Sequence, residues 1–278
     1  MTQIIEKSIT VDGLNIAYTV IGEGNAKPIF FAHGLLSNGR DYDALGTALA
    51  IKGYRCIAID LPGRGKSDCF NNPKLYKPLN YIPHCLAVIN AEIGNAPFDW
   101  FGVSLGGIIG MGLCSAPNVN IKRLILGDIG AQIPRKGLNA VSHLAKTSPI
   151  FDTKDTAIRF LKLRCSHWGI TKDETWDHLI AHNIVQNDDK YIMHYDPAIG
   201  GSLARYNITV KLWHIWKKIK QPVLLLRGES SILLPAKIAK KMEKKYTGEN
   251  FKEITFENCG HVPNLMEKAQ IQRVLEHF

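Results

Sequence analysis

Hydrophobic residues along the chain gather in short runs, and several of these runs are unbroken. Ile29–Ala32 and Val223–Leu226 are two examples, and such runs are typical of strands covered on both faces. The pattern predicts eight strands: Ile4–Val11, Asn15–Ile21, Pro28–Ala32, Tyr54–Ile59, Phe98–Val103, Ile121–Leu126, Val223–Arg227 and Phe251–Phe256. Helical periodicity lies between or after them: Asp41–Lys52, Tyr81–Ile93, Leu105–Ser115, Ala236–Tyr246 and Glu267–Phe278. This alternation predicts an α/β fold, with a mostly parallel sheet and helices on both faces.

Two departures from the alternation define the predicted domain organisation. The dipeptide Asp12-Gly13 separates the first two strands, which indicates an antiparallel hairpin at the sheet edge. Between about Ala131 and Lys217 the sequence indicates helix and loop, with no clear strand. Helices inserted between consecutive strands must lie on top of the sheet. We therefore predict a core of residues 1–130 and 218–278 and a helical cap of residues 131–217.

Composition and charge exclude several classes of function. The chain has 278 residues and a net charge of +9, and many of its lysines surround Ile238, Met242 and Tyr246. These three recur every four residues, so the lysines form the solvated face of a helix and no nucleic-acid partner is expected.

No apolar run approaches the roughly 18 residues of a transmembrane segment, and Glu6 and Lys7 interrupt any secretory signal. The six cysteines are scattered without a Cys-x-x-Cys pair, so we expect a reduced, cytoplasmic protein without a disulfide scaffold or structural zinc site.

The segment Gly102-Val103-Ser104-Leu105-Gly106 carries the strongest chemical signal. It places a serine between a predicted strand and a predicted helix, in the pattern Gly-x-Ser-x-Gly. A serine on such a tight turn projects its hydroxyl from the sheet, and small neighbours let the turn pack closely. The helix N-terminus also leaves backbone N–H groups near that oxygen. Ser104 is therefore the predicted nucleophile.

Two further segments supply what acyl transfer needs. His33-Gly34-Leu35 follows the third strand, and its loop can bring the N–H of Leu35 to the same point as that of Leu105. Two converging N–H donors form an oxyanion hole. We interpret His33 as a histidine that holds this loop. His261 follows the last strand, and from there it can reach Ser104 as general base.

These pieces together resemble the α/β-hydrolase fold family over essentially the whole chain. The resemblance rests on His33-Gly34, the turn from Asp60 to Asp68, the elbow around Ser104, and Gly260-His261. Within the family the chain is similar to bacterial capped serine hydrolases, which are often labelled esterases, lipases or polyhydroxybutyrate-depolymerase-like enzymes. Asp128-Ile129-Gly130 and Tyr195-Asp196-Pro197 agree with that grouping. The implied activity is hydrolysis of a carboxylic ester of a small or medium apolar acyl group through an acyl-enzyme, with a small-molecule substrate and no cofactor.

The catalytic acid departs from the family pattern. Relatives carry it in a stretch resembling Gly-x-x-Ser-Asp-x-Leu, and here Ile232 stands at the aspartate position. Isoleucine cannot accept a hydrogen bond from an imidazole. Asp128, at the end of the strand expected to lie next to this loop, is the predicted substitute. Glu229 is the weaker candidate because it comes early in its loop.

Several alternative interpretations remain beside this one. The same serine machinery could hydrolyse a carbon–carbon bond, and loss of the usual acid would also suit a ligand-binding relative without catalytic activity. Gly65-Lys66-Ser67 lacks the upstream glycine of a phosphate-binding loop, where Asp60 stands instead. His178 and His182 lie four residues apart on a predicted helix, but the pattern offers no third ligand, so no metal site is expected. The sequence carries no signal for an oligomeric state.

Overall fold

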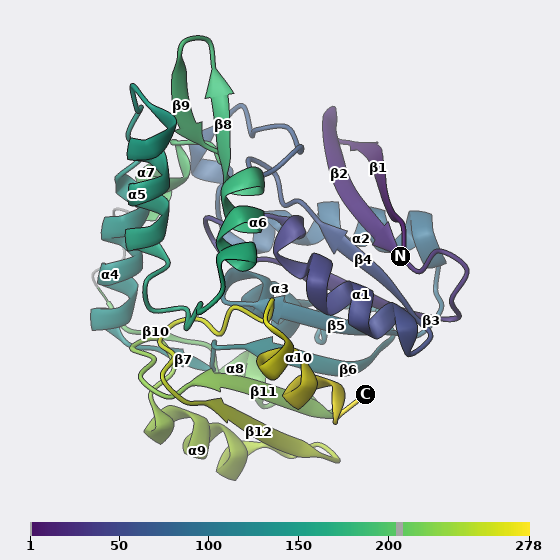
Figure 1. Cartoon of the computed structure of the whole chain (residues 1–278). Helices are drawn as coiled ribbons and strands as arrows, with labels where there is room; N and C mark the ends of the chain where they lie inside the picture. The colour runs from purple at the N-terminus through teal and green to yellow at the C-terminus, as the bar shows by residue number, and fades with distance from the viewer. Residues whose placement is uncertain (1, 204–207) are drawn as a thin grey trace.

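An eight-stranded sheet forms the centre of the computed structural model, which describes residues 2–203 and 208–278 (Figure 1). The strands follow the order β1-β2-β4-β3-β5-β6-β11-β12, and pairing is parallel from β4 to β12. The antiparallel β1–β2 hairpin forms one edge, as predicted. The bounds of these strands are β1 Ile4–Val11, β2 Leu14–Ile21, β3 Lys27–Ala32, β4 Tyr54–Ile59, β5 Phe98–Val103, β6 Ile121–Gly127, β11 Val223–Gly228 and β12 Phe251–Phe256. All eight predicted strands and the predicted α/β fold are confirmed.

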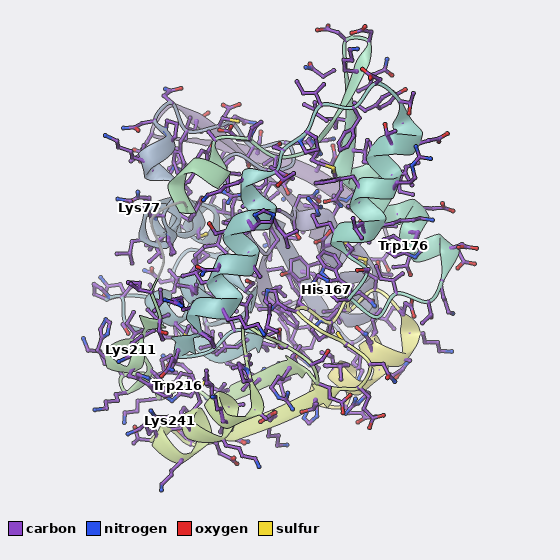
Figure 2. All side chains as sticks on the ribbon, turned by 90° about the vertical axis from the view of Figure 1, so that its left-hand side faces the viewer. Lys77, His167, Trp176, Lys211, Trp216 and Lys241 are labelled. Carbon is purple, nitrogen blue, oxygen red and sulfur yellow. The ribbon has the colours of Figure 1, made fainter. Side chains whose placement is uncertain are left out.

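Helices cover both faces of the sheet because its strands are apolar on both sides. Along β3, Ile29 and Phe31 pack with one cluster of buried residues, whereas Phe30 and Ala32 pack with another. One face is covered by α1 (Asp43–Ile51) and α10 (Lys268–Leu275). The other face is covered by four helices: α2 Ile82–Ile93, α3 Leu105–Leu113, α8 Trp213–Trp216 and α9 Ala236–Lys245. In α9, Ile238 and Met242 are buried, and Lys241 lies at the surface (Figure 2).

The chain between β6 and β11 leaves the sheet and returns to it at one place. Short strands β7 (Gln132–Ile133) and β10 (Val210–Lys211) pair with each other at the two ends of this segment. Its larger helices gather with a hairpin at one end of the sheet (Figure 1). The remaining elements are α4 Arg135–Lys146, α5 Lys154–Arg164, α6 Asp173–Asn183, β8 Ile184–Asn187, β9 Lys190–Met193 and α7 Ile199–Leu203. Short 3-10 turns occur at η1 Gly39–Tyr42, η2 Pro73–Leu75 and η3 Pro78–Tyr81.

The expectation that this segment contains no strand was wrong. Strands β8 and β9 form an antiparallel hairpin in which Asn187 pairs with Lys190 across a two-residue turn. Asp188 in that turn has a φ of 55°, a left-handed conformation that aspartate tolerates better than most residues. The two strands are short and pair only with each other, so the runs of apolar residues that mark the main sheet are absent here.

The structure was also compared with the sequence predictions about membrane-spanning helices and disulfide bonds. Within the described residues, no helix is long and apolar enough to span a membrane. All six cysteines are free thiols, and burial raises the pKa of the Cys85 thiol to about 12. Neither oxidation nor ready ionisation of that buried thiol is favoured.

Candidate active site

Ser104 lies on a sharp turn between β5 and α3. Its φ of 51° and ψ of −108° are strained for a residue with a side chain. The turn is tight enough that a Cβ at Gly102 would come within 2.1 Å of the Gly106 carbonyl oxygen, and one at Gly106 within 1.9 Å of the Ala32 oxygen. Both positions therefore require glycine, and the fold supplies the geometry that the Gly-x-Ser-x-Gly pattern predicted.

His261 bridges Ser104 and Asp128. Its Nε2 lies 3.1 Å from Ser104 Oγ, and its Nδ1 lies 2.6 Å from Asp128 Oδ2. Because an ionised carboxylate only accepts hydrogen bonds, Nδ1 carries the proton and donates it to Asp128, which leaves Nε2 free to accept from the serine hydroxyl. We refer to Ser104, His261 and Asp128 as the relay.

The structure separates the candidates for the acid. Asp128 follows β6, whose neighbour is β11, and its side chain is fully buried against His261. Glu229 is exposed, and its Oε2 accepts a hydrogen bond from the Asn258 backbone N–H at 3.3 Å. Ile232 is 43% exposed and takes no part in the relay. Of the carboxylates considered, Asp128 is the one that is brought to the imidazole.

The loop after β11 holds Asp128 instead of supplying a carboxylate. Gly228 N–H donates to Asp128 Oδ1 at 2.9 Å, and Ser231 Oγ donates to Oδ2 at 2.5 Å. Ser231 is buried, and its oxygen also accepts from the Leu234 N–H at 3.0 Å. Sequence reasoning missed Ser231. The signal was present, since a carboxylate moved to β6 needs donors from the neighbouring β11 loop.

The segment predicted to form the oxyanion hole lies against the nucleophile. A Cβ at Gly34 would come within 3.9 Å of Ser104 Cβ, so the next residue, Leu35, is held beside the turn. Leu105 is the first residue of α3, where backbone N–H groups lack partners within the helix. Arg64, which sequence reasoning also missed, donates from Nε to the Leu35 carbonyl at 2.9 Å. The backbone that carries Leu35 is therefore anchored.

His33 is placed as a structural histidine, in agreement with its interpretation from sequence. The ring is buried, and Nδ1 donates to the Gly34 carbonyl at 2.6 Å while Nε2 accepts from Leu61 N–H at 3.0 Å. Burial lowers the pKa of His33 to about 3, and the nearby Arg64 guanidinium acts in the same direction. A neutral ring with both nitrogens engaged holds two loops together.

The segment between β6 and β11 braces the loop that carries His261. His167 lies where this segment meets the C-terminal part of the chain (Figure 2), and its carbonyl accepts from Gly260 N–H at 2.7 Å. Asn264 Nδ2 donates to the Trp168 carbonyl at 3.1 Å. Movement of this segment would therefore displace the imidazole.

A cavity of about 100 Å³ opens above Ser104 and His261. Its walls are mostly apolar and come from both the sheet loops and the segment between β6 and β11, the latter contributing Val141, Leu144, Arg164, His167 and Trp168. Trp213 lies in the same segment as Trp168 but does not line this cavity; its Nε1 donates to Gln132 Oε1 at 3.2 Å, and Lys241 lies over its ring. The two tryptophans therefore have different surroundings.

One part of the cavity wall is polar and incompletely bonded. Asp41 from η1 and Arg164 from α5 both line the cavity, and Asn183 at the end of α6 interacts with Asp41. Among the described residues, Asp41 Oδ1, Arg164 Nη1 and Asn183 Nδ2 are buried and have no hydrogen-bond partner. Burial raises the pKa of Asp41 to about 6, although Ser37, Asn183 and Arg164 oppose the rise. We refer to Asp41, Arg164 and Asn183 as the Asp41 cluster.

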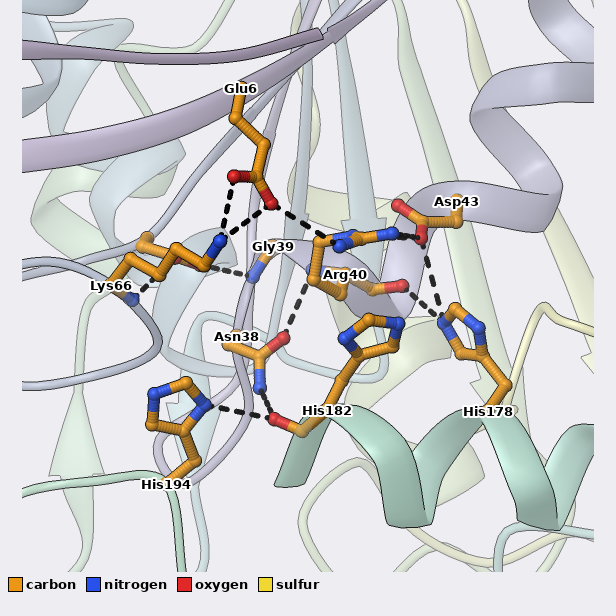
Figure 3. A network of polar contacts seen from close by, with 10 residues as sticks. Glu6, Asn38, Gly39, Arg40, Asp43, Lys66, His178, His182 and His194 are labelled. Atoms are coloured by element: carbon orange, nitrogen blue, oxygen red, sulfur yellow. Dashed lines mark hydrogen bonds and ion pairs between the residues drawn. The ribbon is translucent and has the colours of Figure 1, made fainter. Parts of the chain in front are cut away.

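A second polar network lies between α1, α6 and β1, away from the relay (Figure 3). Asp43 lies beside His178 and His182, where it could serve as the third metal ligand that the sequence pattern did not offer. One potential ligand atom from each of the three residues lies within 4.8 Å of the other two. Arg40, however, donates to Asp43 Oδ2 through Nε at 2.8 Å and Nη2 at 2.6 Å. His178 Nε2 donates to the Arg40 carbonyl at 2.8 Å. The Arg40 guanidinium therefore already pairs with Oδ2 of Asp43, whereas Oδ1 of Asp43 is buried without a hydrogen-bond partner among the described residues.

Comparison with known proteins agrees with this geometry. Residues 29–273 match the model of the alpha/beta hydrolase family. The chain is 28% identical to a 3-hydroxybutyrate-oligomer hydrolase of Cupriavidus necator, over 95% of this chain and 92% of that protein. A crystal structure of a Rickettsia typhi protein assigned as a hydrolase superposes with a TM-score of 0.90 and 33% identity, covering 99% of this chain and 98% of that one. An alpha/beta hydrolase from Novosphingobium aromaticivorans superposes with a TM-score of 0.84 and 26% identity, with both chains covered completely. The chain belongs to the alpha/beta hydrolase family.

Proposed function

We propose that the protein is a serine hydrolase that cleaves carboxylic esters of small acyl groups through an acyl-enzyme. The observation that carries the proposal is the relay itself, with Ser104 Oγ 3.1 Å from His261 Nε2 and His261 Nδ1 2.6 Å from Asp128. A nucleophile, a base and an acid in this order and at these distances are the requirements of acyl transfer.

Each member of the relay has a distinct step. His261 Nε2 takes the proton of Ser104 as its oxygen attacks the ester carbonyl, and the imidazolium then protonates the departing alkoxide. Asp128 fixes the tautomer of His261 and stabilises the positive charge that forms on it. The N–H groups of Leu35 and Leu105 stabilise the oxyanion of each tetrahedral intermediate. Water, activated by the same imidazole, then hydrolyses the acyl-enzyme.

The cavity supports a small acyl group. Sites for drug-sized ligands commonly enclose about 300–1,000 Å³, and the cavity above Ser104 is about 100 Å³. Residues 131–217 contribute part of its wall, so we infer that this segment acts as a cap that sets which acyl groups enter. The Cupriavidus necator relative is named for hydrolysis of 3-hydroxybutyrate oligomers, whose units are joined by carboxylic ester bonds. The same class of bond is proposed here.

Ester turnover and active-site labelling together test this function. The protein should hydrolyse p-nitrophenyl acetate and butyrate faster than the octanoate, and a fluorophosphonate should label it with loss of activity in proportion. The Ser104→Ala variant is the matched control and should do neither. A folded protein that binds esters but is neither labelled nor active would instead be a binding protein. Labelling combined with cleavage of β-diketones, but not esters, would favour carbon–carbon hydrolysis.

A further inference from the structure

A second cavity, of about 310 Å³, lies between β1, β2, η1, the loop after β4 and the C-terminal end of α6. Among the described residues, it shares no lining residue with the cavity above Ser104. Five of its polar lining residues are seen in Figure 3: Glu6, Arg40, Lys66, His182 and His194. None of them belongs to the relay, so the proposed ester hydrolysis gives this cavity no role.

Thr19 on β2 presents a hydroxyl group to this cavity. The residue is 7% exposed, and its Oγ1 is buried without a hydrogen-bond partner among the described residues. Thr19 pairs with Glu6 across the β1–β2 hairpin, and side chains of directly paired residues lie on the same face of a sheet. The Glu6 side chain reaches Arg40 and Lys66 in the cavity wall. The Thr19 hydroxyl is therefore on the cavity side, where a bound ligand would supply the partner it lacks.

Positive groups surround the part of the cavity that His182 lines. Burial lowers the pKa of His182 to about 4. Three basic side chains lower this pKa further: Arg40, His178 and His194. The Glu6 carboxylate acts in the opposite direction, and its effect is the smallest. Positive charge therefore predominates around the ring, which favours a bound anion.

The carboxylates of the cavity wall leave its cations available to a stronger anion. Both Glu6 oxygens accept from Lys66 Nζ, at 2.8 and 2.6 Å, and Oε1 lies 3.7 Å from Arg40 Nη1. The side chains of Glu6 and Lys66 are 50% and 62% exposed, so their ion pair is weak and Glu6 can turn into solvent. Asp60 is already bonded, because its two oxygens accept from the Gly39 and Lys66 backbone N–H groups at 2.7 and 2.9 Å. A ligand with more negative charge than one carboxylate would displace Glu6.

We propose that this second cavity binds the phosphate group of a small molecule. A phosphate dianion carries more charge than the Glu6 carboxylate, and its oxygens can accept from Thr19, Arg40 and Lys66 together. The backbone N–H groups of Gly65-Lys66-Ser67 already donate within the protein, so side chains make these contacts. The volume is at the lower end of the range typical of small-molecule sites, which leaves room for an organic group beside the phosphate. A phosphate monoester should therefore bind more tightly than inorganic phosphate.

Titration of the wild-type protein tests the inference without reference to ester turnover. Phosphorus NMR follows inorganic phosphate and glycerol 2-phosphate in separate titrations, with potassium chloride keeping the ionic strength constant. We expect saturable binding of both, and tighter binding of the monoester. Saturation by inorganic phosphate alone would support the site and identify the free ion as its ligand. Absence of saturable binding of either compound at millimolar concentrations would overturn the inference.

Three variants and one control locate the bound phosphate. Thr19→Val keeps the shape of the side chain and should weaken binding about tenfold, without lowering the melting temperature, because the lost hydroxyl had no partner in the described residues. Lys66→Met should also weaken binding. Glu6→Gln should tighten it several-fold, since the competing carboxylate is removed, and a merely structural role of Glu6 predicts no such gain. Lys237→Met removes a positive charge from α9, outside the cavity wall, and should change the affinity little. Unchanged affinity in folded Thr19→Val or Glu6→Gln protein would place the phosphate elsewhere and overturn the assignment.

Discussion

The relay and the Asp41 cluster are two groups of polar side chains that each contribute to the wall of one cavity, and they differ in how completely they are bonded. Asp128 is fully buried, and its two oxygens accept from Gly228, Ser231 and His261. The Asp41 cluster keeps three buried atoms without partners among the described residues. Both groups include a carboxylate with a buried oxygen atom, so burial alone does not explain the difference.

The complete bonding of the relay suits the role proposed for it. A relay that moves protons needs its side chains fixed before substrate arrives, and complete hydrogen bonding provides this preorganisation. The relay gains its partners from sheet loops after β6, β11 and β12, whereas the Asp41 cluster combines η1 with two helices of the segment between β6 and β11. The relay is thus held by loops of the sheet, whereas the Asp41 cluster lies where a sheet loop meets the segment between β6 and β11.

Of the changes considered, removal of the predicted nucleophile should have the largest effect on ester turnover. Ser104→Ala should lower ester turnover by about 10⁴-fold or more, since only binding and the oxyanion hole then remain. The fold should be unaffected because Gly102 and Gly106 set the turn. Steady-state rates and thermal unfolding measure the two effects. Retention of most activity in protein free of contaminating esterase would refute the assignment of the nucleophile.

Asp128→Asn should lower turnover by roughly 10²- to 10⁴-fold, because an amide can hold the wrong tautomer of His261. Glu229→Gln is the matched control and should have little effect. Adding Ile232→Asp to Asp128→Asn should recover part of the loss by restoring a carboxylate at the usual family position. Rates are compared per folded molecule, since a new charge can destabilise the site. Near-normal kinetics in Asp128→Asn would leave a Ser–His pair as the catalytic unit.

Asp41→Asn should raise stability, but only at neutral and higher pH. The pKa of Asp41 is raised to about 6 by burial, so the folded protein holds this proton more tightly than the unfolded chain. Stability is therefore lost as pH rises from about 4 to about 6, as the buried carboxyl ionises. The variant should gain about 1–3 kcal/mol in the free energy of unfolding at pH 8, and little at pH 4. Urea unfolding at both values tests this, and an equal change at both would exclude ionisation of Asp41 as the cause.

Ser231→Ala should lower kcat by about tenfold, because Asp128 Oδ2 loses one of its donors. A purely structural role would reduce the amount of folded protein without altering catalysis. The pH profile of kcat/KM distinguishes the two, since weaker support of Asp128 should shift the limb that reports the base. Ser231→Thr keeps the hydroxyl and should restore most of the rate. If Ser231→Ala alters only the melting temperature, Ser231 does not position the acid.

The smallest effect expected is on acyl preference, through the residues that the segment between β6 and β11 contributes to the cavity wall. Trp168→Ala should change relative activity between acetate and hexanoate esters by a few-fold, because Trp168 lines the cavity. Trp213→Ala is the matched control, since Trp213 contacts Gln132 and Lys241 instead. Equal changes in both variants that follow a fall in melting temperature would mean that Trp168 only stabilises the fold.

The main sheet and the elbow could be predicted from the sequence because their signals are local. Apolar runs specify the strands, and the spacing of Gly102, Ser104 and Gly106 specifies a turn. The pairing of β6 with β11 was expected from the family resemblance, and it made Asp128 a candidate before its contacts were known. Such features depend on short stretches of chain or on a familiar strand order.

Other features depend on distant segments that sequence patterns do not connect. Ser231 follows β11 and contacts Asp128, which lies 103 positions earlier in the chain. Asp41, Arg164 and Asn183 come from three separate elements, and none lies in a recognisable motif. The β8–β9 hairpin was missed because its strands are half-exposed and short. Each of these requires knowledge of which loops meet in space.

Trapping the acyl-enzyme tests the central claim most directly. The wild-type protein is mixed with p-nitrophenyl butyrate, quenched with acid within milliseconds to seconds, and digested for mass spectrometry. We predict one butyryl group, located on Ser104, that forms with the burst of p-nitrophenol and disappears as substrate is exhausted. Turnover of the ester with no adduct, or with an adduct on another residue, would contradict the account.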